Sequence, residues 1–143
     1  MTTVLTQIAA SAGLVLLMTA IHAVGLAGMS RLLRLDKSRL EHHAFDGRAV
    51  LLSGIVGVSV FALHTFEIWI FAAFYLAVGA IGSLEEALYF SASAYATLGR
   101  AVDFFPIEWR LIGALEALVG FVLIGWSTAF MATTMARLRR TEE

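Results

Sequence analysis

The chain has 143 residues, of which 59% are hydrophobic and 15% are charged, with a net charge of −1 and no cysteine. Soluble domains average about 45–50% apolar residues, so the composition indicates a membrane protein with no room for a soluble ligand-binding domain. The charge argues against a nucleic-acid partner, which needs a basic surface. The lack of cysteine excludes disulfides, thiolate metal sites and thiol catalysis.

The first apolar run covers residues 4–29 and contains no Asp, Glu, Lys or Arg. A membrane span needs about 20 mostly apolar residues. The run lacks the basic start of a signal peptide and is too long for its apolar region, so we expect an additional, retained helix over residues 1–30. The charged segment 31–48 predicts a cytoplasmic loop or an interfacial helix, with Asp36 as the helix N-cap.

Two later apolar runs predict two more membrane helices. The run at 49–81 is interrupted only by His64 and Glu67. At about 1.5 Å per residue it is longer than the hydrocarbon layer is thick, so it must tilt or protrude. The run at 109–136 is followed by three arginines within residues 137–140. The sequence therefore predicts an all-α membrane protein with three transmembrane helices.

A shorter apolar segment, residues 83–97, separates the last two runs. Ser83 and Glu86 have the spacing of a capping box, which opens a helix. About 14 helical residues cover only about 21 Å, which is too short to cross the membrane. We expect a re-entrant helix followed by an irregular loop at 97–103, surrounded by protein or by a water-filled cavity.

The distribution of positive charge predicts the orientation. Eight of the ten Lys and Arg residues fall within 31–48 or 137–140. The positive-inside rule places both segments in the cytoplasm. We therefore expect a multi-pass protein of the inner or plasma membrane, with the N-terminus outside and the C-terminus in the cytoplasm.

The order of span, re-entrant helix, irregular loop and span resembles the pore domain of the potassium-channel family, which would occupy residues 49–143. Residues 87–97 are similar to the family's pore helix, and Tyr89 and Phe90 stand where an aromatic pair braces the selectivity filter. The residues that resemble the Thr-Val-Gly-Tyr-Gly filter are Thr97, Leu98, Gly99, Arg100 and Ala101.

The resemblance extends into the last span, where Gly120 and Gly125 have the spacing of the family's hinge glycine and helix-crossing residue. It implies that Phe121, Ile124 and Thr128 line or gate a cavity. It also implies a homotetramer in the bilayer, because four loops supply the carbonyls that replace the hydration shell of the ion. The expected ligand is a permeant monovalent cation such as K⁺, held by backbone atoms alone, with no cofactor and no bound metal.

The filter departs from the family pattern in its outer half. Arg100 replaces the aromatic residue and Ala101 the second glycine, so we expect reduced selectivity. A buried arginine needs a partner, and the supporting acids within reach are Glu116, Glu67 and Asp103. The alternative is that Arg100 points into the mouth of the pore, where four copies would repel cations.

His64 and Glu67 lie three residues apart and share one helix face. They form either a hydrogen-bonded pair facing the neighbouring span or a pH sensor near the pore, since histidine titrates in the physiological range. His22 stands alone in the first span, where it is expected to be a packing residue. The alternative to a packing role is that His22 and His64 together ligate a haem.

Two rival functions follow from these alternatives. One is a non-conducting pore-domain relic with a structural or regulatory role in the membrane. The other is a membrane redox subunit that binds haem. An enzyme is not expected, because no nucleophile–base pair or metal cluster occurs at a workable spacing.

Overall fold

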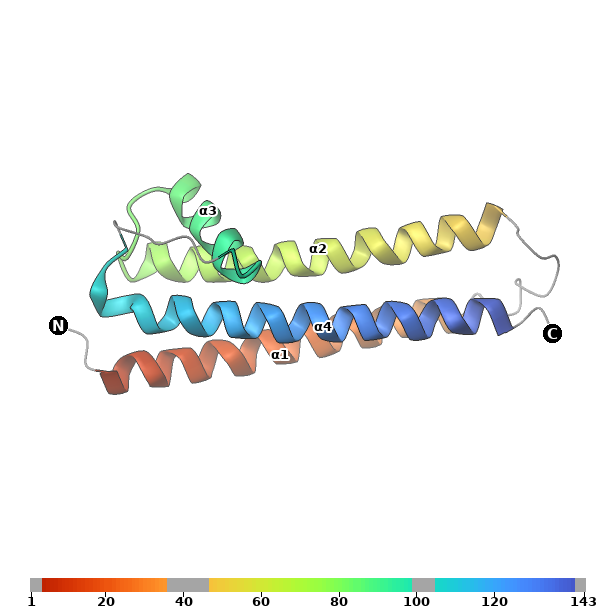
Figure 1. Ribbon diagram of the computed structural model, residues 1–143, viewed down its shortest axis with the longest axis horizontal. Coiled ribbons are helices and arrows are strands. Elements are labelled where there is room, and N and C mark those ends of the chain that lie inside the picture. Colours follow the sequence, from red (N-terminus) through yellow and green to blue (C-terminus); the bar gives the residue numbers. More distant parts are fainter. Residues whose placement is uncertain (1–3, 36–46, 99–104, 141–143) are drawn as a thin grey trace.

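The computed structural model of the protein describes residues 4–35, 47–98 and 105–140. Its elements are α1 (Val4–Leu35), α2 (Gly47–Ala77), α3 (Leu84–Tyr95), a single 3₁₀ turn η2 (Ile107–Trp109) and α4 (Arg110–Arg140). The three long helices run side by side, with α2 antiparallel to α1 and α4, and the short α3 lies against one end of the bundle (Figure 1). The expected N-cap Asp36 lies outside the described residues.

Three helices are long and apolar enough to cross a membrane, over Val4–Leu32, Val50–Ala77 and Ile107–Ala136. Each exceeds the length of about 20 residues that a span requires. Large apolar side chains cover much of their outer surface, including Leu5, Val58 and Phe121, which are 66–78% exposed. The predictions of an all-helical fold and of three helices able to span a membrane are therefore confirmed, and the described residues contain no strand.

The end of α2 is set by a backbone motif. The N–H of Ala80 donates to the Tyr75 carbonyl at 2.9 Å, and the N–H of Gly79 donates to the Leu76 carbonyl at 3.1 Å. These two bonds form a Schellman motif, whose left-handed position is Gly79 at φ 66°. Consequently α2 stops at Ala77, although the apolar run in the sequence continues to residue 81.

The short helix α3 begins where the sequence predicts. Ser83 is the N-cap, and its hydroxyl oxygen accepts from the N–H of Glu86 at 3.2 Å. The buried face includes Ala87, Ser91 and Tyr95, which are 0–2% exposed. Their spacing of four residues places them in one row, which packs between α2 and α4. Twelve residues cover about 18 Å, so α3 does not cross the bundle.

The chain returns after α3 to the end of the bundle at which it entered. Phe105 stacks on Phe90 with ring centroids 4.2 Å apart, and its ring lies edge-on to Tyr75 at 5.3 Å. Tyr75 belongs to the last turn of α2, and Phe105 is followed directly by η2 and α4. Phe105 therefore lies at the end of the bundle where α2 ends and α4 begins.

Helix α1 packs along both α4 and α2. Near its start, the Gln7 side-chain oxygen accepts from the N–H of Leu111 at 3.3 Å. Leu111 lies in the first turn of α4, where backbone N–H groups have no partner within the helix. Farther along, an added Cβ at Gly25 would lie 2.7 Å from the Leu63 side chain, so α1 and α2 approach closely there.

Candidate functional site

The last turn of α3 ends in a strained residue. The N–H groups of Leu98 and Thr97 donate to the carbonyls of Ser93 and Ala94, both at 2.9 Å, which forms a second Schellman motif. Its left-handed position is Thr97 at φ 58°, whereas the same position after α2 is Gly79. A side chain at a left-handed position costs about 1–2 kcal/mol. Strain of this kind gathers at functional sites.

The backbone of this last turn lies directly against α4. A Cβ added at Gly120 would lie 2.9 Å from both the Cα and the carbonyl carbon of Tyr95, and closer still to its carbonyl oxygen. Gly113, two turns earlier, would meet the ring of Phe90 at 3.0 Å. The resemblance assigns Gly120 to a hinge. In the structure, the missing side chain is what allows α3 to end against α4.

Glu116 of α4 is fully buried between α2 and α3. Tyr75 donates its hydroxyl proton to Oε2 at 2.5 Å, and the Ser91 hydroxyl lies 2.5 Å from Oε1. Ser91 Oγ also lies 2.9 Å from the carbonyl oxygen of Ile68. A hydroxyl has one proton and cannot donate to both oxygens. All three bonds are satisfied when Glu116 carries a proton, donates it to Ser91, and Ser91 donates to Ile68.

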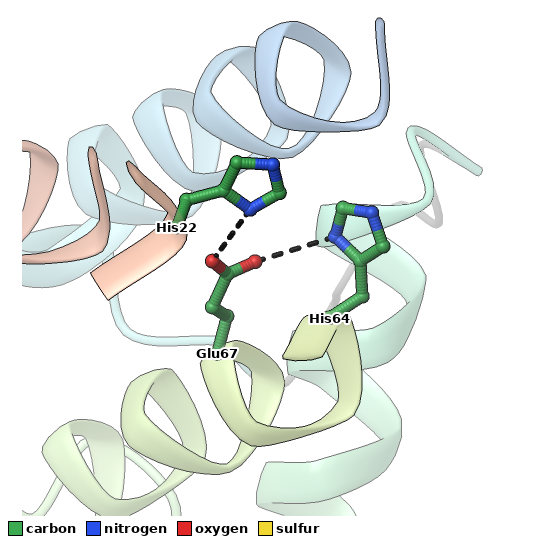
Figure 2. A group of neighbouring side chains, drawn as sticks. All are labelled: His22, His64 and Glu67. Carbon is green, nitrogen blue, oxygen red and sulfur yellow. Dashed lines mark hydrogen bonds and ion pairs between the residues drawn. The ribbon is translucent and has the colours of Figure 1, made fainter. Parts of the chain in front are cut away.

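Glu67 of α2 is the second fully buried carboxyl group. His22 of α1 approaches Oε1 through Nδ1 at 2.9 Å, and Tyr95 of α3 donates its hydroxyl proton to Oε2. His64 Nδ1 lies 2.8 Å from the Tyr95 hydroxyl oxygen and 3.3 Å from Oε2. Ser127 of α4 lies 3.1 Å from His22 Nε2. The cluster joins α1, α2, α3 and α4, and Figure 2 shows both imidazoles turned toward Glu67.

The two carboxyl groups hold the same face of α3. Ser91 bonds to Glu116 from α4, and Tyr95, one turn later, bonds to Glu67 from α2. Buried carboxyl groups are costly unless their oxygens are paired, so these bonds fix α3 in depth and rotation. Arg100, which the sequence pairs with one of these glutamates, lies outside the described residues, as do Gly99, Ala101 and Asp103.

The other expected site residues differ in how far they are exposed. Phe90 is buried against Phe105, whereas its neighbour Tyr89 is half exposed. Thr97 and Leu98, the described part of the expected filter, are both exposed. The residues expected to line the cavity, Phe121, Ile124 and Thr128, and the expected helix-crossing residue Gly125 are all exposed, on a side of α4 that the rest of the described chain does not cover.

Sequence reasoning missed the role of His22 and of the two tyrosines. His22 carried a usable signal, because an ionisable residue inside a span usually has a partner. Tyr75 and Tyr95 carried none, since each stands in an apolar segment in which a tyrosine also serves as a packing residue. Which tyrosine meets which glutamate depends on how α3 is docked, and spacing along the chain does not encode that.

Comparison of the chain with protein-family models, with curated proteins and with solved structures found no match. The functional argument therefore rests on the chain's own residues. Among those described, its main features are the short α3 between α2 and α4, the strained Thr97 and the two buried carboxyl groups.

Proposed function

We propose that the protein is the subunit of a homotetrameric cation channel of the potassium-channel type, with a filter loop altered in its outer half. The observation that carries the proposal is the path of the chain around α3. The helix packs between α2 and α4, ends part of the way along them, and the chain is back beside Phe90 at Phe105. Irregular backbone at membrane depth is tolerated where it is buried in protein or lines a water-filled cavity.

The strain at Thr97 supports the same proposal. Thr97 stands where the resemblance puts the first filter residue, and it adopts a left-handed conformation that β-branched residues avoid. The rest of the structure holds it there, because the turn before it is fixed by Tyr95 on one side and by Gly120 on the other. An ion filter built from carbonyl oxygens needs unusual backbone angles held in this way.

The proposed tetramer follows from the chemistry of such a filter. One chain supplies one loop, and a ring of carbonyls around an ion requires four loops related by a cyclic axis. The uncovered side of α4, with Phe121 and Thr128 exposed, is the surface this assembly would use around a central cavity. An inner or plasma membrane, with the N-terminus outside, belongs to the proposal through the positive-inside rule.

The haem alternative fits the geometry poorly. The rings of His22 and His64 have centroids 5.2 Å apart, and both approach the carboxyl group of Glu67. His22 has no exposed surface, and its second nitrogen lies beside Ser127. A porphyrin between the two rings would have to displace all of these contacts.

Ion flux in liposomes tests the proposal. We expect the native protein to pass monovalent cations with weak preference for K⁺ over Na⁺. The double change Arg100→Tyr with Ala101→Gly restores the family's filter residues and should raise that preference. The matched control makes the same two substitutions on the exposed surface of α1, at Arg31 and Ala27, and should leave selectivity unchanged.

Two outcomes would contradict the proposal. If native protein and double variant both form tetramers and neither conducts, the protein is a non-conducting pore-domain relic with a structural role. If the native protein already shows the strong K⁺ preference of an intact filter, the expected effect of Arg100 and Ala101 is wrong.

A further inference from the structure

The buried cluster around Glu67 has the dimensions of a metal coordination sphere. One ligand atom each from His22, His64 and Glu67 lie within 4.8 Å of one another. Tyr95 adds a hydroxyl oxygen 2.8 Å from His64 Nδ1. Figure 2 shows the Nδ1 atoms of the two imidazoles facing the two carboxylate oxygens from different directions. Four donor atoms from α1, α2 and α3 therefore converge on one place.

The cluster also contains no permanently charged cation among the described partners of Glu67. The partners of Glu67 within the described residues are His22, His64 and Tyr95, and none of them carries a fixed positive charge. With neutral imidazoles, the cluster has one negative charge, although Glu67 has no exposed surface. An uncompensated charge inside a membrane protein is strongly unfavourable, so an ionised Glu67 needs a cation beside it, which is either a protonated imidazole or a bound metal ion.

We propose that a divalent transition-metal ion with the preferences of Zn²⁺ binds here. Its ligands are His22 Nδ1, His64 Nδ1, a carboxylate oxygen of Glu67 and the phenolate oxygen of Tyr95. Zn²⁺ is bound in proteins by imidazole nitrogens and by carboxylate oxygens. A phenolate and a carboxylate together balance the two positive charges of the ion, which leaves no net charge in the membrane interior.

The separations between the donor atoms can be compared with those of a tetrahedral zinc site. Zn²⁺ bonds of about 2.0–2.2 Å in a tetrahedron put neighbouring ligand atoms about 3.3–3.5 Å apart. The separations here are 2.9 Å between His22 Nδ1 and Glu67 Oε1, 3.3 Å between His64 Nδ1 and Glu67 Oε2, and 2.8 Å between His64 Nδ1 and the Tyr95 oxygen. Two of these three separations are shorter than those of a tetrahedral site, so the donor atoms would have to move apart to admit the ion.

The surroundings of His22 support metal binding independently. Metal-ligating histidines usually donate their other ring N–H to a neighbouring acceptor, which fixes the tautomer. Ser127 Oγ lies 3.1 Å from His22 Nε2 and can accept that proton once a metal ion replaces the hydrogen bond between His22 Nδ1 and Glu67. His64 is the most exposed of the three, with 15% of its side chain accessible, and offers a route for the ion.

A metal here would tie α1 to the end of α3. His22 comes from α1, and Tyr95 is the last residue of α3, immediately before the turn that contains Thr97. The ion would therefore cross-link the additional N-terminal helix to the proposed pore loop. The inference goes beyond the proposed function and does not depend on it, because metal binding is measured on the purified protein without ion flux.

The test is a titration of the purified, chelator-treated protein with Co²⁺, followed by Zn²⁺ competition. We expect one Co²⁺ per chain, with the visible absorption of tetrahedral coordination, displaced by Zn²⁺. Because the Trp126 ring lies 5.5 Å from that of His22, Co²⁺ should also quench tryptophan fluorescence, and Trp126→Phe should remove the quenching while the absorption band remains. Binding should release protons, since Tyr95 must lose its own.

Two single variants test the histidine ligands, and a double variant serves as their control. His22→Asn and His64→Gln should each weaken Co²⁺ binding by at least about tenfold, since each removes a direct ligand, and even indirect partners change affinity 10–100-fold. The double variant His42→Ala with His43→Ala removes the other two histidines of the chain and should bind like the native protein.

Two results would overturn the proposal. One is a native protein that shows no cobalt absorption band at a modest excess of Co²⁺. The other is a band that survives His22→Asn and His64→Gln but disappears in the His42 and His43 double variant. If a histidine variant does not assemble, the native absorption band and the loss of tryptophan quenching in Trp126→Phe still decide whether the metal is at this cluster.

Discussion

At Gly120, α4 lies directly against the backbone of α3. Glycine within a helix is unfavourable by about 0.5–1 kcal/mol relative to alanine, so a glycine here needs a compensating contact. The compensation is the backbone of Tyr95, which occupies the space that a Cβ would need. Gly125, five residues later on the same helix, has nothing within 4 Å of an added Cβ.

We expect Gly120→Ala to lower the stability of the protein by about 1–3 kcal/mol, because the added methyl group overlaps backbone atoms that cannot rotate away. Thermal unfolding of the detergent-solubilised protein measures the change. Gly125→Ala is the matched control and should be neutral or slightly stabilising. Equal effects of the two variants would show that Gly120 is not a packing contact.

The stability of helix α3 depends on its contacts with α2 and α4. Isolated helices shorter than about 12–15 residues are marginal in water, and α3 has 12 residues. Two hydrogen-bonded carboxyl groups and the buried row formed by Ala87, Ser91 and Tyr95 supply its docking. The position of the proposed filter loop is thus set by polar contacts as well as by apolar packing.

We expect Ser91→Ala to destabilise the protein by about 1–3 kcal/mol, because the buried Glu116 loses a hydrogen-bond partner. Ser93→Ala on the same helix is the control, since its hydroxyl makes none of the side-chain hydrogen bonds found in the described part of the chain, and it should change little. Denaturation followed by helical circular dichroism compares them.

Glu116→Gln provides a further check on the Ser91 bond. The amide oxygen still accepts from Tyr75, and the amide N–H replaces the carboxyl proton donated to Ser91. We expect this variant to stay within about 1 kcal/mol of the native protein. A loss as large as that of Ser91→Ala would mean that Glu116 carries a charge rather than a proton.

The sequence predicted elements better than it predicted contacts. Long apolar runs and the Ser83 cap are local signals, and both the three spans and the start of α3 follow them. The bond between His22 and Glu67 joins residues 45 positions apart, and it depends on the rotation of two helices that are apolar on nearly every side. Such helices carry too weak a polar pattern to fix their facing sides.

At the scale of the whole molecule, α1 contributes to the buried polar cluster and does not merely pack around the outside of the other helices. His22 reaches Glu67 and Ser127, so α1, α2 and α4 meet around one buried imidazole. The opposite side of α4, around Phe121 and Thr128, has no neighbour within the described chain. The proposed tetramer uses that side and leaves α1 at the periphery.

We expect a cysteine at position 128 to react with a charged, membrane-impermeant thiol reagent, because in the proposed tetramer Thr128 faces a water-filled cavity. The chain contains no cysteine, so the introduced thiol is unique. Val58→Cys, on an exposed side of α2, faces lipid and should react far more slowly. Similar rates at the two positions in reconstituted protein would contradict the tetrameric arrangement.

The positions of the two buried glutamates along the chain have a consequence for biosynthesis. A charged residue near the centre of a membrane helix costs about 2.5–3.5 kcal/mol during insertion, and a protonated carboxyl group without a hydrogen-bond partner is also unfavourable there. Glu67 follows its partner His22 in the chain, and Glu116 follows both Tyr75 and Ser91. During synthesis from the N-terminus, each glutamate therefore reaches the membrane after a hydrogen-bonding partner has already been made.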